Sequence, residues 1–143
     1  MNNIENIYKM LNSDSLSEEN EGERLAKELK DLSLLICPPA PPYVWIKCAN
    51  ILSEKDDCEL EPYLFGLLEW LHDLNWPGAL IIFERLKKFP VEKLTQPFTD
   101  CVMKATKSNY KRWLMFLSYF LLENESLKAE LSQEVIENLL KGC

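Results

Sequence analysis

Apolar residues recur along the chain at the three- and four-residue spacing of an amphipathic α-helix. The first example is Ile4, Ile7, Tyr8 and Leu11, which follow the i, i+3, i+4, i+7 pattern. The same spacing predicts further helices over 25–32, 45–52, 60–71, 79–86, 98–105, 110–121 and 131–139. No segment sustains a period-two alternation, and only four glycines interrupt the chain. We therefore predict an all-α fold.

The predicted helices between 44 and 122 are separated by only a few residues. Short connections force consecutive helices to be antiparallel neighbours. The resulting helical hairpins recur at a spacing close to that of HEAT-type repeats. We predict a short, irregular α-solenoid of HEAT-like hairpins, with a closed helical bundle as the alternative. The helix over 79–86 should be central, because Leu80 and Ile81 extend its apolar stripe almost around the whole helix.

Two segments depart from the helical pattern. Residues 12–22 are polar, acidic and rich in Ser and Asn, so we expect a mobile linker there. Four prolines within 38–42 favour an extended polyproline conformation and a stiff connector. Pro97 is expected near the first turn of its helix, where proline is tolerated. We divide the chain into residues 1–35, the N-terminal helices with an acidic linker, and 36–143, a helical-repeat domain, which together form one compact unit.

The stretch "LLEWLHDLNWPGA" joins two of these helices. Asn75 is placed to cap the second helix, because its side chain can accept a hydrogen bond from an unpaired N–H two or three residues later. Trp76 and Pro77 suit the first helical turn, so the three residues are predicted to form a structural corner. His72, the only histidine, lacks a catalytic partner, since the adjacent Asp73 does not face it on a helix. We predict no catalytic residue.

Two longer stretches carry a family signature: "CANILSEKDDCELEPYLFGLLEWLHDLNWPGALIIFERL" and, later, "YKRWLMFLSYFLL". They resemble the bacterial domain of unknown function 5071, which has a Leu-Glu-Trp-Leu, Asp, Asn-Trp-Pro segment and then a Trp-bearing helix. The likeness covers roughly residues 37–122, and its signature falls on Trp70, Asp73, Asn75, Trp76, Pro77 and Trp113. This chain departs at His72, where we expect Gln in many relatives. The resemblance implies a small helical-repeat domain without an assigned activity.

Charge is unevenly distributed along an acidic chain of formal net charge −7. Residues 36–74 carry two basic and seven acidic side chains, whereas residues 75–113 carry eight basic and three acidic ones. A protein that is negative overall is a poor general binder of nucleic acid, because phosphate contacts require a cationic surface. One basic segment is thus set within an acidic protein.

The acidic segment favours docking to a protein, since complementary charge steers association and sets specificity. We predict a non-enzymatic helical-repeat module that binds a protein partner. An immunity protein that neutralises a basic toxin domain is one example of such a module. Trp70 or Trp76 could lie exposed as an anchor. We expect no cofactor and no metal, because the acidic cluster lacks the spacing of an EF-hand loop. The predicted partner-binding residues are Asp56, Asp57, Glu59, Glu61, Glu69, Trp70 and Asp73.

The alternative function is nucleic-acid binding by the basic 75–113 segment, should its cations line one ridge of the molecule. These cations are Arg85, Lys87, Lys88, Lys93, Lys104, Lys107, Lys111 and Arg112.

Cysteine usage and hydropathy predict the compartment. The five cysteines are scattered, odd in number and without a Cys-x-x-Cys pair, so we expect neither a disulfide framework nor a zinc site. The N-terminus lacks a signal-peptide pattern, and no apolar run approaches the ~20 residues that span a bilayer. We therefore expect a cytoplasmic protein that does not enter a membrane.

Overall fold

The computed structural model describes residues 3–142, and within them the chain forms helices and no strand, which confirms the predicted all-α fold. No helix in this part of the chain is both long and apolar enough to cross a membrane. The α-helices are α1 Ile4–Leu11, α2 Leu16–Lys27, α3 Pro42–Ser53, α4 Asp57–Leu60, α5 Leu64–Glu69, α6 Ala79–Lys87, α7 Val91–Lys107, α8 Lys111–Leu122, α9 Glu125–Glu130 and α10 Gln133–Gly142. Three short 3₁₀ turns accompany them: η1 Leu32–Leu35, η2 Glu61–Tyr63 and η3 Trp70–His72.

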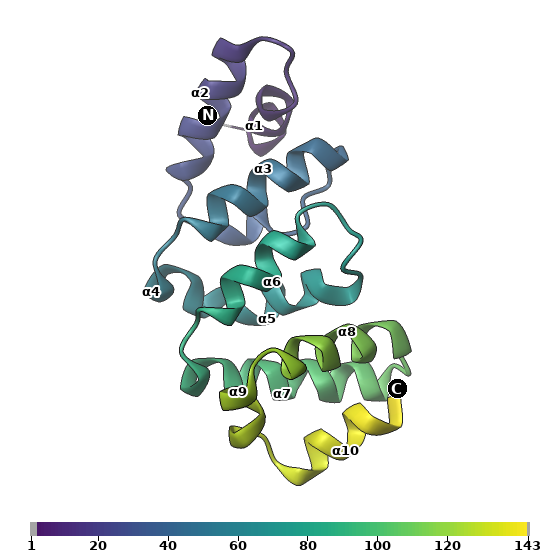
Figure 1. Cartoon of the computed structure of the whole chain (residues 1–143). Helices are drawn as coiled ribbons and strands as arrows, with labels where there is room; N and C mark the ends of the chain where they lie inside the picture. The colour runs from purple at the N-terminus through teal and green to yellow at the C-terminus, as the bar shows by residue number, and fades with distance from the viewer. Residues whose placement is uncertain (1–2, 143) are drawn as a thin grey trace.

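The helices stack in chain order, with α1 and α2 at one end of the molecule and α10 at the other (Figure 1). Helix α3 packs on α6, α5 packs on α7, and α10 packs on both α7 and α8. The main contacts of α1 and α2 are with each other and with α3. Packing between near neighbours in the chain is common to a short solenoid and to an elongated bundle. Both architectures therefore stay predictions.

The mobile linker predicted over 12–22 is wrong, because α2 begins at Leu16. Its acidic side chains have a structural use: Lys47 of α3 lies 2.8 Å from carboxylate oxygens of both Glu19 and Glu23. The polar composition that indicated a linker belongs to a helix with few apolar positions, held to its neighbour partly by ion pairs. This helix ends at Lys27, short of the predicted boundary at residue 32.

Prolines divide the chain differently from the predicted pattern. The helix predicted over 60–71 is instead divided among the end of α4, η2, α5 and η3, and Pro62, which has no backbone N–H to donate, lies in η2. Pro97, expected in a first turn, instead lies inside α7, which begins earlier than predicted. Pro42 is the first residue of α3, so the last proline of the proline-rich segment begins a helix.

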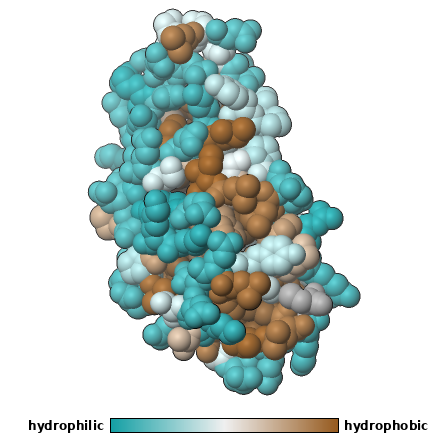
Figure 2. Space-filling model, in the orientation of Figure 1, coloured by the Kyte–Doolittle hydropathy of each residue, from teal (hydrophilic) through white to brown (hydrophobic). Residues whose placement is uncertain are grey.

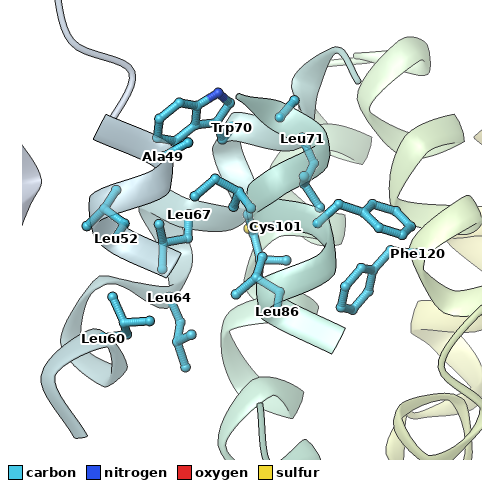
Figure 3. Close-up of a cluster of buried hydrophobic side chains, with 14 of the residues drawn as sticks. Ala49, Leu52, Leu60, Leu64, Leu67, Trp70, Leu71, Leu86, Cys101 and Phe120 are labelled. Atoms are coloured by element: carbon cyan, nitrogen blue, oxygen red, sulfur yellow. The ribbon is translucent and has the colours of Figure 1, made fainter. Parts of the chain in front are cut away.

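A buried apolar core runs through the stack, and Figure 3 shows one part of it. There Leu67 of α5, Leu86 of α6, Cys101 of α7 and Phe120 of α8 come together, each at most 1% exposed. Burying one such aliphatic or aromatic side chain stabilises the fold by roughly 1.5–3 kcal/mol. The core therefore holds α5, α6, α7 and α8 in fixed positions relative to one another.

Candidate partner-binding surface

Two buried tryptophans donate hydrogen bonds to backbone carbonyl oxygens around the turn between η3 and α6. The Nε1–H of Trp70 donates to the carbonyl oxygen of Pro77 at 2.9 Å. The Nε1–H of Trp113 donates to the carbonyl oxygen of Leu68 at 3.1 Å. A buried indole N–H without a partner costs free energy, so the first bond holds the turn against η3 and the second holds α8 against α5.

Trp70 cannot be the exposed anchor that the sequence predicted. Its side chain is 0% exposed, and its ring meets Trp45 edge-on with centroids 5.6 Å apart. Trp70 lies at the edge of the apolar stripe of its predicted helix, which suggested exposure, but Pro77 and Gly78 fold back against the indole and cover it. Trp76 is half-buried and packs edge-on against the same Trp45 ring at 5.7 Å. Both tryptophans thus belong to one aromatic cluster.

Gly78, and not Asn75, is the residue that caps the start of α6. Gly78 has a φ of +79°, which glycine adopts without strain. A Cβ atom at this position would lie 2.8 Å from the Cβ of Ala49. The predicted Asn75 cap is therefore wrong: Asn75 is exposed, and Trp76 and Pro77 lie in the turn before the helix rather than in its first turn.

His72 lies among aromatic rings. It stacks on Trp113 with a centroid distance of 3.9 Å and on Trp76 at 5.8 Å, while Tyr110 meets it edge-on at 4.8 Å. Its Nδ1 contacts the backbone carbonyl oxygen of Glu69. Indole faces and a backbone carbonyl hold the ring in place but offer it no nucleophile to activate. These contacts favour a packing role for His72.

The cysteines of the described residues are free thiols. Cys48 and Cys101 are buried, Cys37 is half-buried and Cys58 is exposed, while Cys143 lies outside the described residues. Burial raises the pKa of both Cys37 and Cys48 to about 12. These two thiols therefore stay protonated near neutral pH and are poor nucleophiles.

Most of the acidic residues predicted to dock a partner are ion-paired within the chain. The pairs are Asp57 with Arg85 (2.6 Å), Glu59 with Lys55 (3.8 Å), Glu61 with Lys93 (3.6 Å), Glu69 with Lys104 (2.8 Å) and Asp73 with Arg112 (3.4 Å). Among the described residues, Asp56 alone of the predicted acidic set has no ion-pair partner. The acidic 36–74 segment thus mainly neutralises the basic segment that follows it.

The same ion pairs engage much of the predicted basic ridge. Lys87 also pairs, with Glu84 and Glu123. Within residues 3–142, the cations of this ridge that lack an ion-pair partner are Lys88, Lys107 and Lys111. A nucleic acid would have to compete with internal carboxylates for the others. In the same part of the chain, no cluster of three or more His, Cys, Asp or Glu side chains is arranged to hold a metal ion.

An exposed apolar face lies over α6, α8 and α10, and we define it by Leu80, Tyr119, Leu122 and Leu140. The exposed fractions of these side chains are 61%, 44%, 72% and 71%. Figure 2 shows apolar atoms gathered on this side of the molecule, over its middle and lower part. Contiguous exposed apolar surface is a common mark of a docking site.

Two hollows flank the ridge formed by Tyr119 and Leu122. A hollow of about 420 Å³ lies between α6 and α8, with Leu80 and Phe83 in its lining. A second hollow, of about 350 Å³, lies between α8 and α10, with Leu140 in its lining. Tyr119 and Leu122 line both hollows, so the apolar face is continuous from α6 to α10.

Sequence reasoning missed this face by placing the helix over 79–86 at the centre of the molecule. Helix α6 is instead covered by α3 and η3 on part of its surface, which leaves Leu80 exposed and Ile81 only partly buried. An apolar stripe that is wider than one neighbouring helix can cover must either lie at the centre of the fold or expose part of itself to water. The wide apolar stripe over 79–86 was therefore the sequence feature from which an exposed apolar patch could have been predicted.

Comparison with known protein families identifies the family of this chain. The sequence model of a family described as "Domain of unknown function (DUF5071)" matches residues 46–141. The matched region contains the structural corner at Asn75, Trp76 and Pro77 and the whole apolar face, whereas α1 and α2 lie outside it. Searches among curated proteins and among solved structures found no match.

Proposed function

Because this chain belongs to the DUF5071 family, whose description names no activity, we propose a function from its surface: a non-enzymatic module that docks a protein partner through the apolar face. The observation that carries the proposal is the exposure of Leu80 and Leu122, at 61% and 72%, on adjoining sides of one hollow. Burying an exposed leucine in an interface is favourable by roughly 1.5–3 kcal/mol before the costs of association.

The proposal moves the docking site away from the predicted acidic cluster. Four of the acids in that cluster pair with cations of the following segment, and the pair of Glu61 with Lys93, in which both side chains are about half exposed, is worth about 0–1 kcal/mol. These acids still contribute to the negative electrostatic potential of a protein with net charge −7. That potential speeds the encounter with a basic partner. Masking of a basic toxin domain by an immunity-type protein is one instance of such docking.

The chemistry of the reactive side chains supports a non-enzymatic role. His72 is stacked between two indole rings. The thiols of Cys37 and Cys48 have raised pKa values because they are buried. A catalytic thiol is expected to ionise near the pH of the reaction, which burial of these two thiols disfavours.

The proposal is tested by quantifying the protein that co-purifies with the tagged chain from its native cells. The double variant Leu80→Asp/Leu122→Asp places charge on the apolar face, and Leu16→Asp is a matched control on α2, where Leu16 is 71% exposed. We expect the double variant to lose recovery of the partner, with affinity reduced at least about thirtyfold, the effect of a central interface anchor. Retention of the partner by the double variant, or equal loss in the control, would contradict the proposal.

Nucleic-acid binding by the 75–113 segment stays the alternative prediction. Lys107 and Lys111 support it, as cations at the junction of α7 and α8 that no described carboxylate neutralises. It requires DNA or RNA retardation at low salt that Lys107→Glu/Lys111→Glu removes. Absence of retardation by the wild-type protein at low salt would exclude it.

A further inference from the structure

The hollow between α6 and α8 combines an apolar floor with carboxylates. Phe83, only 3% exposed, lies in its lining and meets Phe120 edge-on at 5.2 Å. The charged residues that line the hollow are Glu84 and Glu123. Their side chains are 63% and 53% exposed. The hollow therefore suits an apolar group that has a cation next to it.

Glu84 and Glu123, from separate segments of the chain, already hold one ammonium group between them. The Nζ of Lys87 lies 2.8 Å from Oε1 of Glu123 and 3.3 Å from both carboxylate oxygens of Glu84. The hydrogen bond to Glu123 and then that to Glu84 raise the pKa of Lys87 above its ordinary value. The two carboxylates thus bind a cation jointly, and together with Lys87 they leave one net negative charge beside the hollow.

We infer that the partner presents a basic amphipathic helix, which lays apolar side chains into the two hollows and a Lys or Arg against Glu84 and Glu123. This inference rests on the proposed function and adds the chemistry of the partner. An α-helix is about 10–12 Å wide and offers anchors at i, i+3, i+4 and i+7 on one side. Two hollows on either side of the Tyr119 and Leu122 ridge suit such a row of anchors.

Charge disfavours a second copy of this chain as the occupant. In a two-fold dimer the same patch faces itself, so Glu84 and Glu123 of both copies would be gathered at one interface. Each copy also carries a net charge of −7. A basic helix meets Glu84 and Glu123 in the first hollow with complementary charge, while Glu125 and Lys128 in the lining of the second hollow have opposite charges.

The test uses two synthetic helices of about 18 residues, or five turns, with an identical leucine stripe. One carries lysine on its polar side and the other carries glutamate. Binding of each fluorescent helix to the full chain is measured by anisotropy at physiological salt. The variants are Leu122→Asp, Glu84→Gln/Glu123→Gln, and the charge-matched control Glu5→Gln/Glu92→Gln, which changes exposed acids on α1 and α7. Circular dichroism confirms that each variant is folded.

We expect the wild type to bind the lysine helix at least about tenfold more tightly than the glutamate helix. Glu84→Gln/Glu123→Gln should weaken the lysine helix by about three- to tenfold, the combined effect of two exposed ion pairs, while the control stays at the wild-type value. Leu122→Asp should weaken it by at least about thirtyfold. The lysine-helix inference is overturned if neither helix binds, if both bind alike, or if the control loses as much as the Glu84 and Glu123 variant.

The outcomes separate this inference from the proposed function. If both helices bind alike and Leu122→Asp removes both, the apolar docking surface stands and the basic partner is wrong. If Leu122→Asp affects neither helix, the docking surface itself is contradicted. Lys87→Met adds a check of opposite sign: removal of the resident ammonium should tighten the lysine helix about two- to threefold, whereas Lys107→Met, with the same change in net charge, should not.

Discussion

At the scale of single residues, the corner before α6 depends on close approach of the backbone to buried rings. Gly78 takes a left-handed φ, and a Cβ there would lie 3.1 Å from the carbonyl oxygen of Trp45 and 3.1 Å from the ring of Trp70. The Nε1–H of Trp70 in turn binds the carbonyl oxygen of Pro77. The glycine therefore lets the turn close over the indole, and the indole holds the turn in place.

Gly78→Ala and Asn75→Ala separate the cap that the structure has from the one that the sequence predicted. Gly78→Ala should lower the free energy of unfolding by about 1–3 kcal/mol, because alanine is strained at positive φ and clashes with Ala49. Asn75→Ala should change it by at most about 0.5 kcal/mol, since Asn75 is exposed and caps nothing. Urea denaturation measures both values. A larger loss for Asn75→Ala than for Gly78→Ala would restore Asn75 as the cap.

Trp70 is predicted to serve stability and not docking. Trp70→Ala should cost about 3–5 kcal/mol of folding free energy through loss of a fully buried ring. Trp70→Phe should cost about 1–3 kcal/mol, because the carbonyl oxygen of Pro77 loses its donor. Denaturant melts give these values, and the affinity of the folded fraction for the partner should be unchanged. Loss of binding by a Trp70→Phe protein that melts like wild type would reverse this assignment.

At the scale of elements, ion pairs connect successive layers of the stack. Lys47 of α3 holds two carboxylates of α2, Lys104 of α7 reaches Glu69 of α5, and Arg112 of α8 reaches Asp73 beside η3. The sequence showed an acidic segment followed by a basic one but not their pairing, because the partners are separated by 28 to 39 positions and meet only after the helices pack. Helix periodicity, which is local, predicted most α-helical segments correctly.

The contact of Glu19 with Lys47 predicts a pH dependence for the docking of α2 on α3. The ammonium of Lys47 holds the pKa of Glu19 below its ordinary value of 4.5. A carboxyl group with a lowered pKa in the folded state stabilises the fold above its unfolded pKa, and this contribution is lost as the pH falls through the folded value. Glu19→Gln should therefore be less stable than wild type at neutral pH, and the difference should shrink as the pH falls below about 4.5.

Denaturant midpoints over this pH range measure the effect. Glu18→Gln is the control, because Glu18 accepts a hydrogen bond from the hydroxyl of Ser13 and, among the described residues, pairs with no cation. A Glu19→Gln difference that persists unchanged at acid pH would show that the ion pair with Lys47 is not its source.

At the scale of the whole molecule, near-neighbour stacking leaves one side of α6, α8 and α10 without a covering layer. The all-α fold and the family could be predicted from the sequence, because helix periodicity and the Leu-Glu-Trp-Leu and Asn-Trp-Pro signature are local features. The exposure of Leu80 and the burial of Trp70 could not, because both depend on which distant helix or turn lies over the residue. The candidate docking surface is therefore a product of how the helices pack, which local sequence patterns do not predict.

Photo-crosslinking tests the location of the docking surface most directly. A photoreactive amino acid is introduced at Leu122 on the apolar face, at Asp56 in the predicted acidic cluster, or at Leu16 on α2, each in an otherwise wild-type chain in its native cells. All three positions are exposed, so each substitution leaves the core intact. We predict a crosslinked partner from position 122 and none from positions 56 and 16. A partner captured from position 56 but not from position 122 would contradict the account and return the binding site to the acidic cluster.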